Sequence, residues 1–177
     1  MWFQQTPTNQ FIPACFQQAL LAGLVIAVMA LTWGGIHPSA AVAAVDPYVA
    51  RYLDAASPVP LAYDETGAVR EFTGADLSEG KRLFEDSCIN CHVGGATLPD
   101  PTISLSLDAL RGATPPRNNI QNLVAFQRLP MTYDGSQESY WCRQVPETWM
   151  NQEEIEKLAA FVLRAAQKAP GWGTNEF

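Results

Sequence analysis

The five consecutive residues Cys88-Ile89-Asn90-Cys91-His92 form the pattern with the clearest chemical meaning in this sequence. Two thiols three residues apart on a tight turn can add across the two vinyl groups of one porphyrin. The adjacent imidazole can then bind the iron as the proximal ligand. The pattern therefore predicts one haem c that is attached covalently through Cys88 and Cys91 and has His92 on its iron.

Two other interpretations of these residues stay open. Cys88, Cys91, His92 and Cys142 could bind zinc, but zinc requires a tetrahedron, which the adjacent Cys91 and His92 serve poorly. A plain disulfide is the simplest alternative. A thioredoxin-like redox site is less favoured, because it would require a βαβ pattern around the motif, which the sequence does not show.

An electron-transfer haem usually has a second strong axial ligand, yet His92 is the only histidine after residue 44. The remaining candidates are Cys142, Met150 and Met131. Methionine raises the potential of the haem, whereas a cysteine thiolate donates electron density and lowers it. Cysteine and methionine are also common core residues, so the residue types alone leave this choice open.

The N-terminal segment has the order of a secretory signal. The first fifty residues contain no Lys, Arg or Glu, and Ala19–Trp33 is almost wholly apolar. The small residues Ser39–Ala44 follow, which predicts a signal peptide over residues 1–43 with cleavage after Ala43 or Ala44. An uncleaved anchor stays open, because no basic residue precedes the apolar run.

Composition sets limits on the class of protein. Hydrophobic residues make up 47% of the 177 residues, enough for the core of one domain, here residues 44–177. The formal net charge is −7. An acidic chain gains nothing from neutralising phosphates, which argues against a nucleic-acid partner and favours basic partner surfaces.

The elements that must position the motif begin with a hairpin. Residues 59–63 and 68–72 flank Asp64–Gly67, which predicts two strands joined by a four-residue turn over about residues 59–72. A lone hairpin is marginally stable, so we expect it to lie against a larger element. Residues 46–57 give only a weak signal for a short helix.

Two amphipathic helices are predicted at either end of a haem-binding core over about residues 73–169. Thr73 and Asp76 give the first a capping-box start, and it ends at about Ser87. Its apolar face consists of Leu77, Gly80, Leu83 and Phe84. The last helix starts at the cap Asn151 and ends at Pro170. Its apolar face consists of Ile155, Leu158, Ala159, Phe161 and Val162.

Between these helices the signals are weaker. Residues 105–110 predict a short helix, and Pro115-Pro116 suits the first turn of another that ends before Pro130. Residues 94–101 and 137–149 are predicted to be loops. We therefore expect a mainly α, class I-type cytochrome c fold around one covalent haem, with a small N-terminal β-hairpin.

Four stretches occur in an order that is typical of a known family. They are Leu77–Phe84, Cys91–Gly95, Ala113–Arg117 and Thr132–Gly135. Over about residues 58 to 165 the chain resembles the cytochrome c-550 family of cyanobacteria and algae, low-potential extrinsic cytochromes on the lumenal side of photosystem II. The resemblance implies the hairpin, export to the thylakoid lumen and one covalent haem.

The departures from that family bear on the sixth ligand. The family has a second histidine shortly after the Tyr-Asp-Gly turn, and here Cys142 falls within a residue of that position. Met150 falls where the family has a methionine that is not a ligand. The resemblance therefore favours Cys142 as the sixth iron ligand, with Met150 as the alternative. Together with the partly matching tail from Gly171 onward, it indicates a divergent c-550-like paralogue.

The function predicted from these features is low-potential electron transfer in the thylakoid lumen. The expected partner is the lumenal face of photosystem II or a lumenal redox protein, with the chain peripheral to the membrane. The alternative is a structural extrinsic subunit of photosystem II whose haem does not turn over. A haem sensor or peroxidase-like enzyme ranks last, because no distal acid–base pair lies near the motif, so we expect no enzyme activity.

Overall fold

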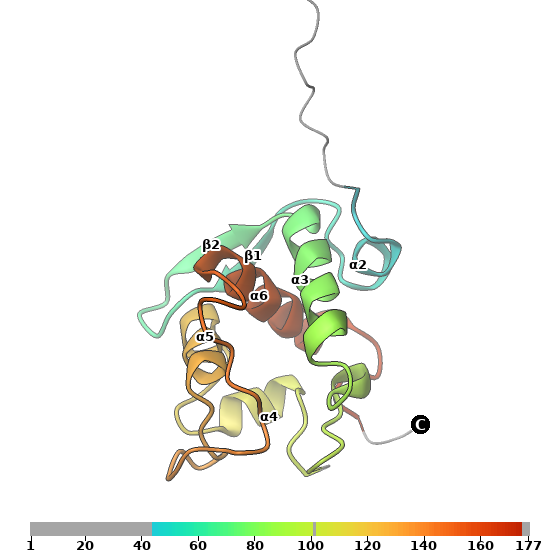
Figure 1. The fold of residues 1–177 in the computed structure, drawn as a ribbon. Coiled ribbons are helices and arrows are strands. Elements are labelled where there is room, and N and C mark those ends of the chain that lie inside the picture. The colour runs from blue at the N-terminus through green and yellow to red at the C-terminus, as the bar shows by residue number, and fades with distance from the viewer. Residues whose placement is uncertain (1–43, 101, 175–177) are drawn as a thin grey trace, which may run out of the picture. The chain divides into compact units, whose positions relative to one another are not determined.

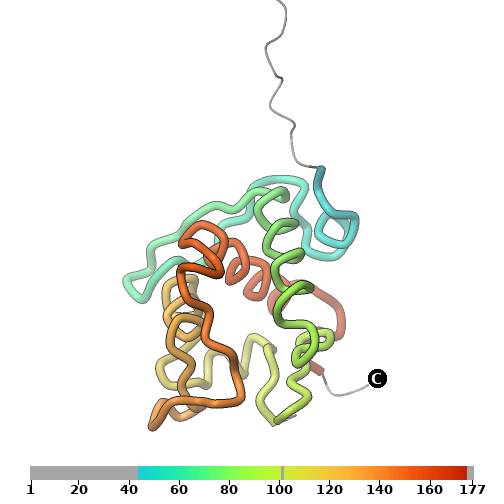
Figure 2. The backbone as a smooth tube through the Cα atoms, viewed as in Figure 1, coloured from blue at the N-terminus to red at the C-terminus, as the bar shows by residue number. Residues whose placement is uncertain are grey.

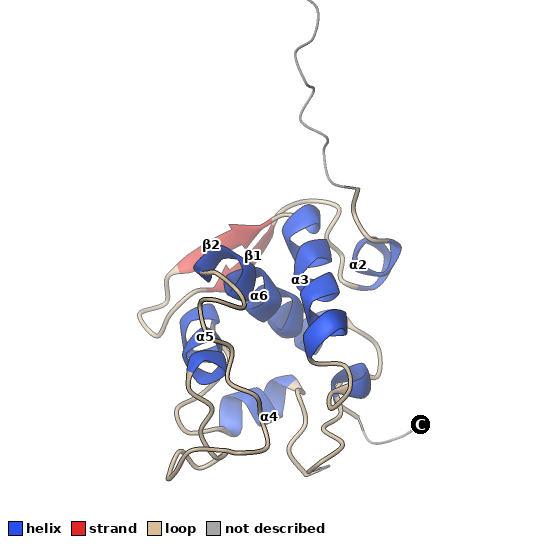
Figure 3. Cartoon of the chain, viewed as in Figure 1, coloured by secondary structure: helices blue, strands red, loops and turns tan. Residues whose placement is uncertain are grey.

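The computed structural model describes residues 44–100 and 102–174, so the predicted signal peptide, residues 1–43, lies outside the described residues. Figure 1 and Figure 3 show the elements in chain order. They are α2 (Pro47–Tyr52), β1 (Val59–Ala62), β2 (Val69–Phe72), α3 (Gly74–Ser87), η1 (Val93–Gly95), α4 (Leu107–Gly112), α5 (Ile120–Arg128) and α6 (Gln152–Lys168). None of the described helices has the length and apolar character that a membrane-spanning helix requires.

Both long helices begin where the sequence predicts them to begin. The Thr73 hydroxyl accepts a hydrogen bond from the Asp76 backbone N–H at 3.1 Å, and the Asp76 carboxylate accepts one from the Thr73 N–H at 3.0 Å. Asn151 and Glu154 make the same reciprocal pair at the start of α6. Each pair satisfies backbone donors that a helix end would otherwise leave without partners.

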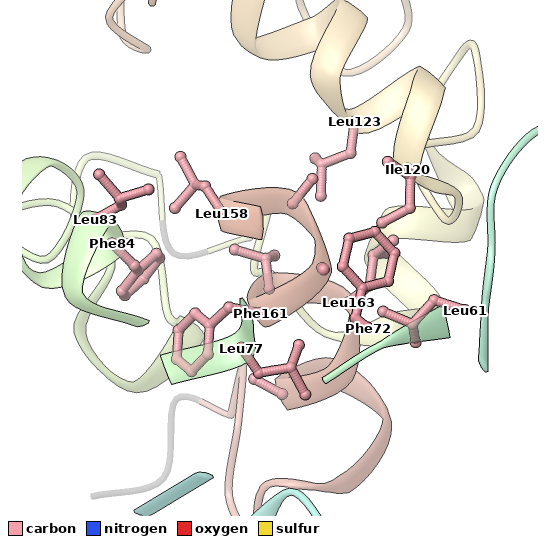
Figure 4. Packing of buried hydrophobic residues seen from close by; sticks show 14 of the residues in the cluster. Leu61, Phe72, Leu77, Leu83, Phe84, Ile120, Leu123, Leu158, Phe161 and Leu163 are labelled. Carbon is pink, nitrogen blue, oxygen red and sulfur yellow. The ribbon is translucent and has the colours of Figure 1, made fainter. Parts of the chain in front are cut away.

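Helices α3 and α6 cross in close contact at Gly80. A Cβ atom on Gly80 would lie 2.7 Å from the carbonyl carbon of Lys157 and 2.9 Å from the Cβ of Phe161. Only glycine permits this approach, because it has no Cβ atom. Phe84 and Phe161 then meet with ring centroids 5.5 Å apart, and Figure 4 shows them beside leucines of α3 and α6.

The hairpin is confirmed, and it packs on the last helix. Strands β1 and β2 pair antiparallel, with Val59 opposite Phe72 and Ala62 opposite Val69. Leu61 and Phe72 point into the core. The buried carboxylate of Glu156 in α6 accepts a hydrogen bond from the Tyr63 hydroxyl at 3.1 Å and pairs with Arg70 of β2. This side-chain cluster supplies the larger support that a two-stranded hairpin needs.

The predicted start of the middle helix is wrong. Helix α5 begins at Ile120, because the Asn119 side chain accepts a hydrogen bond from the Asn122 backbone N–H at 2.8 Å and so caps the helix there. Pro115 and Pro116 lie in the loop before it, and the Thr114–Pro115 peptide bond is cis. The short helix α4 likewise starts two residues later than predicted, at Leu107 after the cap Ser106.

The chain between α5 and α6 is a long loop, as predicted for residues 137–149. Figure 2 shows it leaving α5 and running back to the start of α6. A single bridge pairs Met131 with Glu138. Farther along, the Val145 N–H donates to the Gln127 carbonyl at 2.9 Å and ties the loop to α5. The observed architecture is mainly helical with one small hairpin.

Candidate functional site

The C-terminal end of α3 presents the Cys-x-x-Cys-His motif. Cys88 is the C-cap of the helix, and its backbone N–H donates to the Phe84 carbonyl at 2.8 Å. The N–H groups of Cys91 and His92 both return to the Cys88 carbonyl, at 3.1 and 3.0 Å. The two thiols and the imidazole therefore sit on one tight turn, which is the local geometry that the motif predicted.

The His92 ring is oriented by a neighbour that sequence reasoning missed. Its Nδ1 lies 3.2 Å from the Thr97 hydroxyl. Burial lowers the pKa of His92, and a hydrogen bond from the ring to the Ala96 backbone partly opposes this shift. The neutral imidazole is the form that binds a metal, and a partner on Nδ1 leaves Nε2 available as the ligand atom.

Two adjoining cavities lie beside the motif, with volumes of about 570 and 310 Å³. They have in common the lining residues Cys91, His92, Leu105, Leu123, Phe126, Trp141 and Cys142. Cys88 lines the larger cavity, together with Leu158 and Val162 of α6. The structure therefore brings Cys88, Cys91, His92 and Cys142 to one cavity of the size that protein ligand sites have, which is about 300–1,000 Å³.

The surroundings of Cys88 and Cys142 favour the thiol over the thiolate. Burial raises the pKa of Cys88 to about 12, with the neighbouring Cys142 and Cys91 adding to the shift. Burial also raises the pKa of Cys142, while the positive charge of Arg117 opposes that shift. A thiolate at Cys142 therefore requires a stronger cation than the protein supplies, and a metal ion is such a cation.

The two methionine candidates for the sixth ligand lie in different places. Met131 lines the smaller cavity with Cys142. Met150 is 1% exposed, belongs to the hydrophobic core and lines neither cavity. Its backbone carbonyl accepts a hydrogen bond from Arg128 at 2.9 Å, directly before α6 begins. In this arrangement Met150 is a core residue at the start of a helix.

The geometry gives no support to zinc or to a disulfide. Within residues 44–100 and 102–174, no three His, Cys, Asp or Glu side chains converge as metal ligands do. Cys88, Cys91 and Cys142 are all free thiols.

The cavities suit a large, mostly apolar group with a polar edge. Protein interiors are close-packed, so a space of this size among leucines and aromatic rings indicates a binding site and not a packing defect. The Gln127 side-chain oxygen, on the wall of the larger cavity, is buried and has no hydrogen-bond partner. These residues fit a haem, with thiols at Cys88 and Cys91 for attachment and His92 and Cys142 for the iron.

The C-terminal tail closes the motif side of the site, which the sequence did not predict. The Trp172 ring packs on Phe84 and Phe161, with centroids 5.6 and 5.7 Å apart. Its indole N–H donates to the Leu105 carbonyl at 3.0 Å, and the next residue, Gly173, donates to the Gly94 carbonyl at 2.8 Å. An isolated tryptophan between two glycines just after the last helix was the available signal.

A haem-attachment turn at the end of a helix that crosses the last helix is the arrangement of a c-type cytochrome. The comparison with solved structures identifies the fold as the class I cytochrome c fold. The PsbV2 cytochrome from Thermosynechococcus elongatus superposes with a TM-score of 0.73 at 58% sequence identity, over 74% of this chain and 100% of that one. The predicted fold class is therefore confirmed.

The chain belongs to the cytochrome c-550 family, because residues 52–177 match the cytochrome c-550 domain. A cytochrome c-550-like protein of Thermosynechococcus vestitus is 54% identical over 160 residues, which is 89% of this chain and 90% of that protein. The photosystem II extrinsic protein V of Gloeobacter violaceus is 47% identical over 89% of this chain and 85% of its own length. The resemblance found in the sequence is thereby confirmed, as is the c-550-like paralogue.

Proposed function

We propose that this chain is a monohaem c-type cytochrome that carries single electrons at low potential in the thylakoid lumen. Cys88 and Cys91 hold the haem through thioether bonds, His92 is the proximal iron ligand and Cys142 is the sixth. The observation that carries the proposal is that all four residues line one cavity. When bound, haem supplies reversible one-electron exchange at its iron.

The protein residues fix the conditions of that exchange. Thr97 orients the His92 ring, and the leucines and Phe126 around the cavity exclude water from the iron. A Cys142 thiolate donates electron density, which stabilises the ferric state and lowers the potential. With His92 and Cys142 both held in place, the iron's surroundings would rearrange little when an electron moves, which suits the electron carriers of this family.

The sixth ligand is tested by comparing Cys142→Ser with Met150→Leu. We expect Cys142→Ser to change the ferric absorption and paramagnetic-resonance spectra and to raise the potential. Met150→Leu conserves core volume and should leave both spectra unchanged. An unchanged Cys142→Ser spectrum would remove Cys142 from the iron, and a changed Met150→Leu spectrum would put Met150 in its place.

The proposed location requires export of the chain. Residues 1–43 act as a signal peptide, and residues 44–177 form the cytochrome domain that remains, peripheral on the lumenal side. The apolar run before Ser39–Ala44 and the cyanobacterial relatives support this assignment. Peptide sequencing of the protein from a lumenal fraction should give an N-terminus at residue 44 or 45. An N-terminus at residue 1 would contradict it.

A second candidate function is a structural extrinsic subunit of photosystem II with a haem that does not turn over. The Gloeobacter violaceus relative, named photosystem II extrinsic protein V, favours it. Stoichiometric co-purification with photosystem II cores, without reversible reduction on the timescale of electron flow, would support the structural subunit. Fast reversible reduction by a lumenal redox protein, with no stable complex, would support the carrier.

A further inference from the structure

Arg117 is a buried cation without an ionic partner. Its side chain lies in the loop before α5 and the residue is only 8% exposed. Across residues 44–100 and 102–174, six basic side chains form ion pairs with carboxylates, and Arg117 is not among them. A buried charge is costly unless other groups compensate it, so its place in the fold calls for a reason.

The guanidinium is held firmly by groups that carry no net charge. Its Nη2 donates to the carbonyls of Met131 and Thr132, at 3.0 and 2.8 Å. Its central carbon lies 3.8 Å from the centroid of the Phe126 ring, within the range of a cation–π contact. The Arg117 backbone N–H donates to the Leu110 carbonyl at 2.7 Å. Arg117 therefore joins the end of α4, a face of α5 and the loop that follows α5.

The two carbonyls that Arg117 binds lie at the base of the loop that carries Cys142. Tyr133 and Pro130 tie the same base, because the Tyr133 carbonyl accepts from the Thr114 N–H at 2.8 Å and the Pro130 carbonyl accepts from the Ser139 N–H at 2.9 Å. Arg117 differs from these ties because it brings a positive charge. Like Tyr133 and Ser139, it lines the smaller cavity together with Cys142.

We propose that Arg117 is a positioning residue for the sixth iron ligand, which clamps the base of the 131–142 loop and places a fixed positive charge beside the haem cavity. This inference rests on the proposed function, in which Cys142 binds the iron. The planar fork of the guanidinium sets the position of the loop, and its charge offsets the negative charge of the ligand sulfur.

The charge and the clamp have separate consequences. A fixed positive charge near the iron disfavours the ferric state, which carries one more positive charge than the ferrous state, so Arg117 raises the potential of the haem. The clamp limits how far Cys142 can move from the iron, so Arg117 also keeps the reduced protein closed to added ligands. Lysine keeps the charge and loses the fork, whereas glutamine loses the charge.

The test uses the haem-loaded protein with Arg117→Gln, Arg117→Lys and the control Arg111→Gln. Arg111 is an exposed α4 residue that lines neither cavity, so its change removes the same formal charge at the surface. At a fixed ambient potential, Arg117→Gln should lower the ratio of reduced to oxidised protein about tenfold, which is about 59 mV for a one-electron couple. Arg111→Gln should leave this ratio within about twofold of the wild type, because exposed charges are screened.

The axial-ligand spectrum and carbon monoxide binding report the clamp. Because it keeps the charge, Arg117→Lys should not lower the potential, yet it should show mixed ferric spectra and a larger fraction of reduced protein that binds carbon monoxide. Arg117→Gln should show the same mixture together with its lowered potential. If both variants keep the wild-type spectra and stay closed to carbon monoxide, the positioning role is overturned.

The results that would contradict Cys142 as the iron ligand differ from those that would contradict the role of Arg117. If Cys142→Ser leaves the spectrum unchanged, Cys142 is not the ligand, whatever the Arg117 variants do. If Cys142→Ser changes the spectrum but Arg117→Gln shifts neither potential nor ligand signature, the ligand assignment stands and the inference about Arg117 falls. Because Arg117→Lys retains the buried charge, it keeps the test available should Arg117→Gln fail to fold.

Discussion

The two walls of the cavity are held by different kinds of interaction. The motif wall, Cys88–His92, is the continuation of a regular helix, and its backbone hydrogen bonds join residues three to seven positions apart in the chain. The loop wall, residues 129–150, is held by arginine side chains that reach carbonyls 14 to 22 residues away. Local backbone geometry thus fixes the proposed proximal ligand, whereas long-range contacts, from arginine side chains and from backbone groups, fix the loop of the proposed sixth ligand.

Exposure follows the same division. On the motif wall Phe84 and Phe161 are buried, and the half-buried Trp172 covers them. On the loop wall Tyr140 is 96% exposed and Trp141 is 81% exposed, although they directly precede Cys142 in the sequence. We therefore expect substitutions in the motif wall to lower the free energy of unfolding. Substitutions in the loop wall should instead change the absorption spectrum and the reduction potential of the haem.

The largest expected effect is that of His92→Ala on the motif wall. Without the proximal imidazole the iron has no ligand from the covalent turn, and the haem can no longer complete the core. We expect loss of haem-loaded protein and of cooperative folding, measured by absorption and circular dichroism. A stable, haem-loaded His92→Ala protein with native spectra would contradict the proximal assignment.

Two tryptophans, one beside each wall, allow the effects of the two walls on stability to be compared directly. Trp172→Ala removes the ring that packs on Phe84 and Phe161 and a hydrogen bond to Leu105, so it should lower the free energy of unfolding by about 3 kcal/mol. Trp141→Ala, in the exposed loop, should lower it by less than about 0.5 kcal/mol. Denaturant unfolding of both haem-loaded variants measures the difference. Equal losses would remove the distinction between the walls.

The close crossing of α3 and α6 is tested by Gly80→Ala. Alanine favours a helix by about 1 kcal/mol over glycine, but its Cβ would overlap the Lys157 backbone. Since backbone cannot move aside easily, we expect a net loss of about 2 kcal/mol in the free energy of unfolding. Asp86→Ala, an exposed change in the same helix, is the control and should cost less than about 0.5 kcal/mol. A stabilised Gly80→Ala protein would mean that the helices cross elsewhere.

The smallest expected effect is a pH dependence in the loop wall. Hydrogen bonds from the Thr132 hydroxyl and from Ser136 lower the pKa of Asp134 to about 2, from an ordinary value of 3.8. A carboxyl with a lowered folded-state pKa stabilises the fold above its unfolded pKa, and this contribution is lost as the pH falls from 3.8 towards 2. Asp134→Asn should therefore be less stable than the wild type near neutral pH.

That difference should shrink as the solution is acidified through this interval, measured by denaturant unfolding at a series of pH values. Asp108→Asn is a suitable control, because the Asp108 side chain is 97% exposed and pairs only with a residue of its own helix. A gap between Asp134→Asn and the wild type that is independent of pH would show that the Asp134 carboxylate does not hold the turn.

The motif wall could be predicted from sequence because its signals are local. The capping pair Thr73 and Asp76, the apolar face ending at Phe84 and the attachment turn each follow from residues a few positions apart. The same holds for the hairpin, whose turn at Asp64 and Gly67 is set by short-range hydrogen bonds and a positive φ at the glycine. The structure confirms the helix and the hairpin within a residue or two at their ends.

The loop wall could be predicted only as a loop. Arg117 belongs to a stretch that carried the family resemblance, yet no local pattern connects it with carbonyls 14 and 15 residues away. Thr97 and Trp172 were missed for the same reason, since their contacts with His92 and Leu105 depend on the folded chain. The start of α5 was wrong because a proline suits a helical first turn but also a loop, and the Asn119 cap decided between them.

The account depends most on a haem bound covalently through Cys88 and Cys91, which the intact mass of the purified holoprotein measures directly. We predict the mass of the polypeptide plus one haem, retained after denaturation and extraction with acidic organic solvent. Replacing both cysteines by serine should remove the added mass, whereas Cys142→Ser should keep it. A wild-type polypeptide whose mass contains no haem would contradict the account.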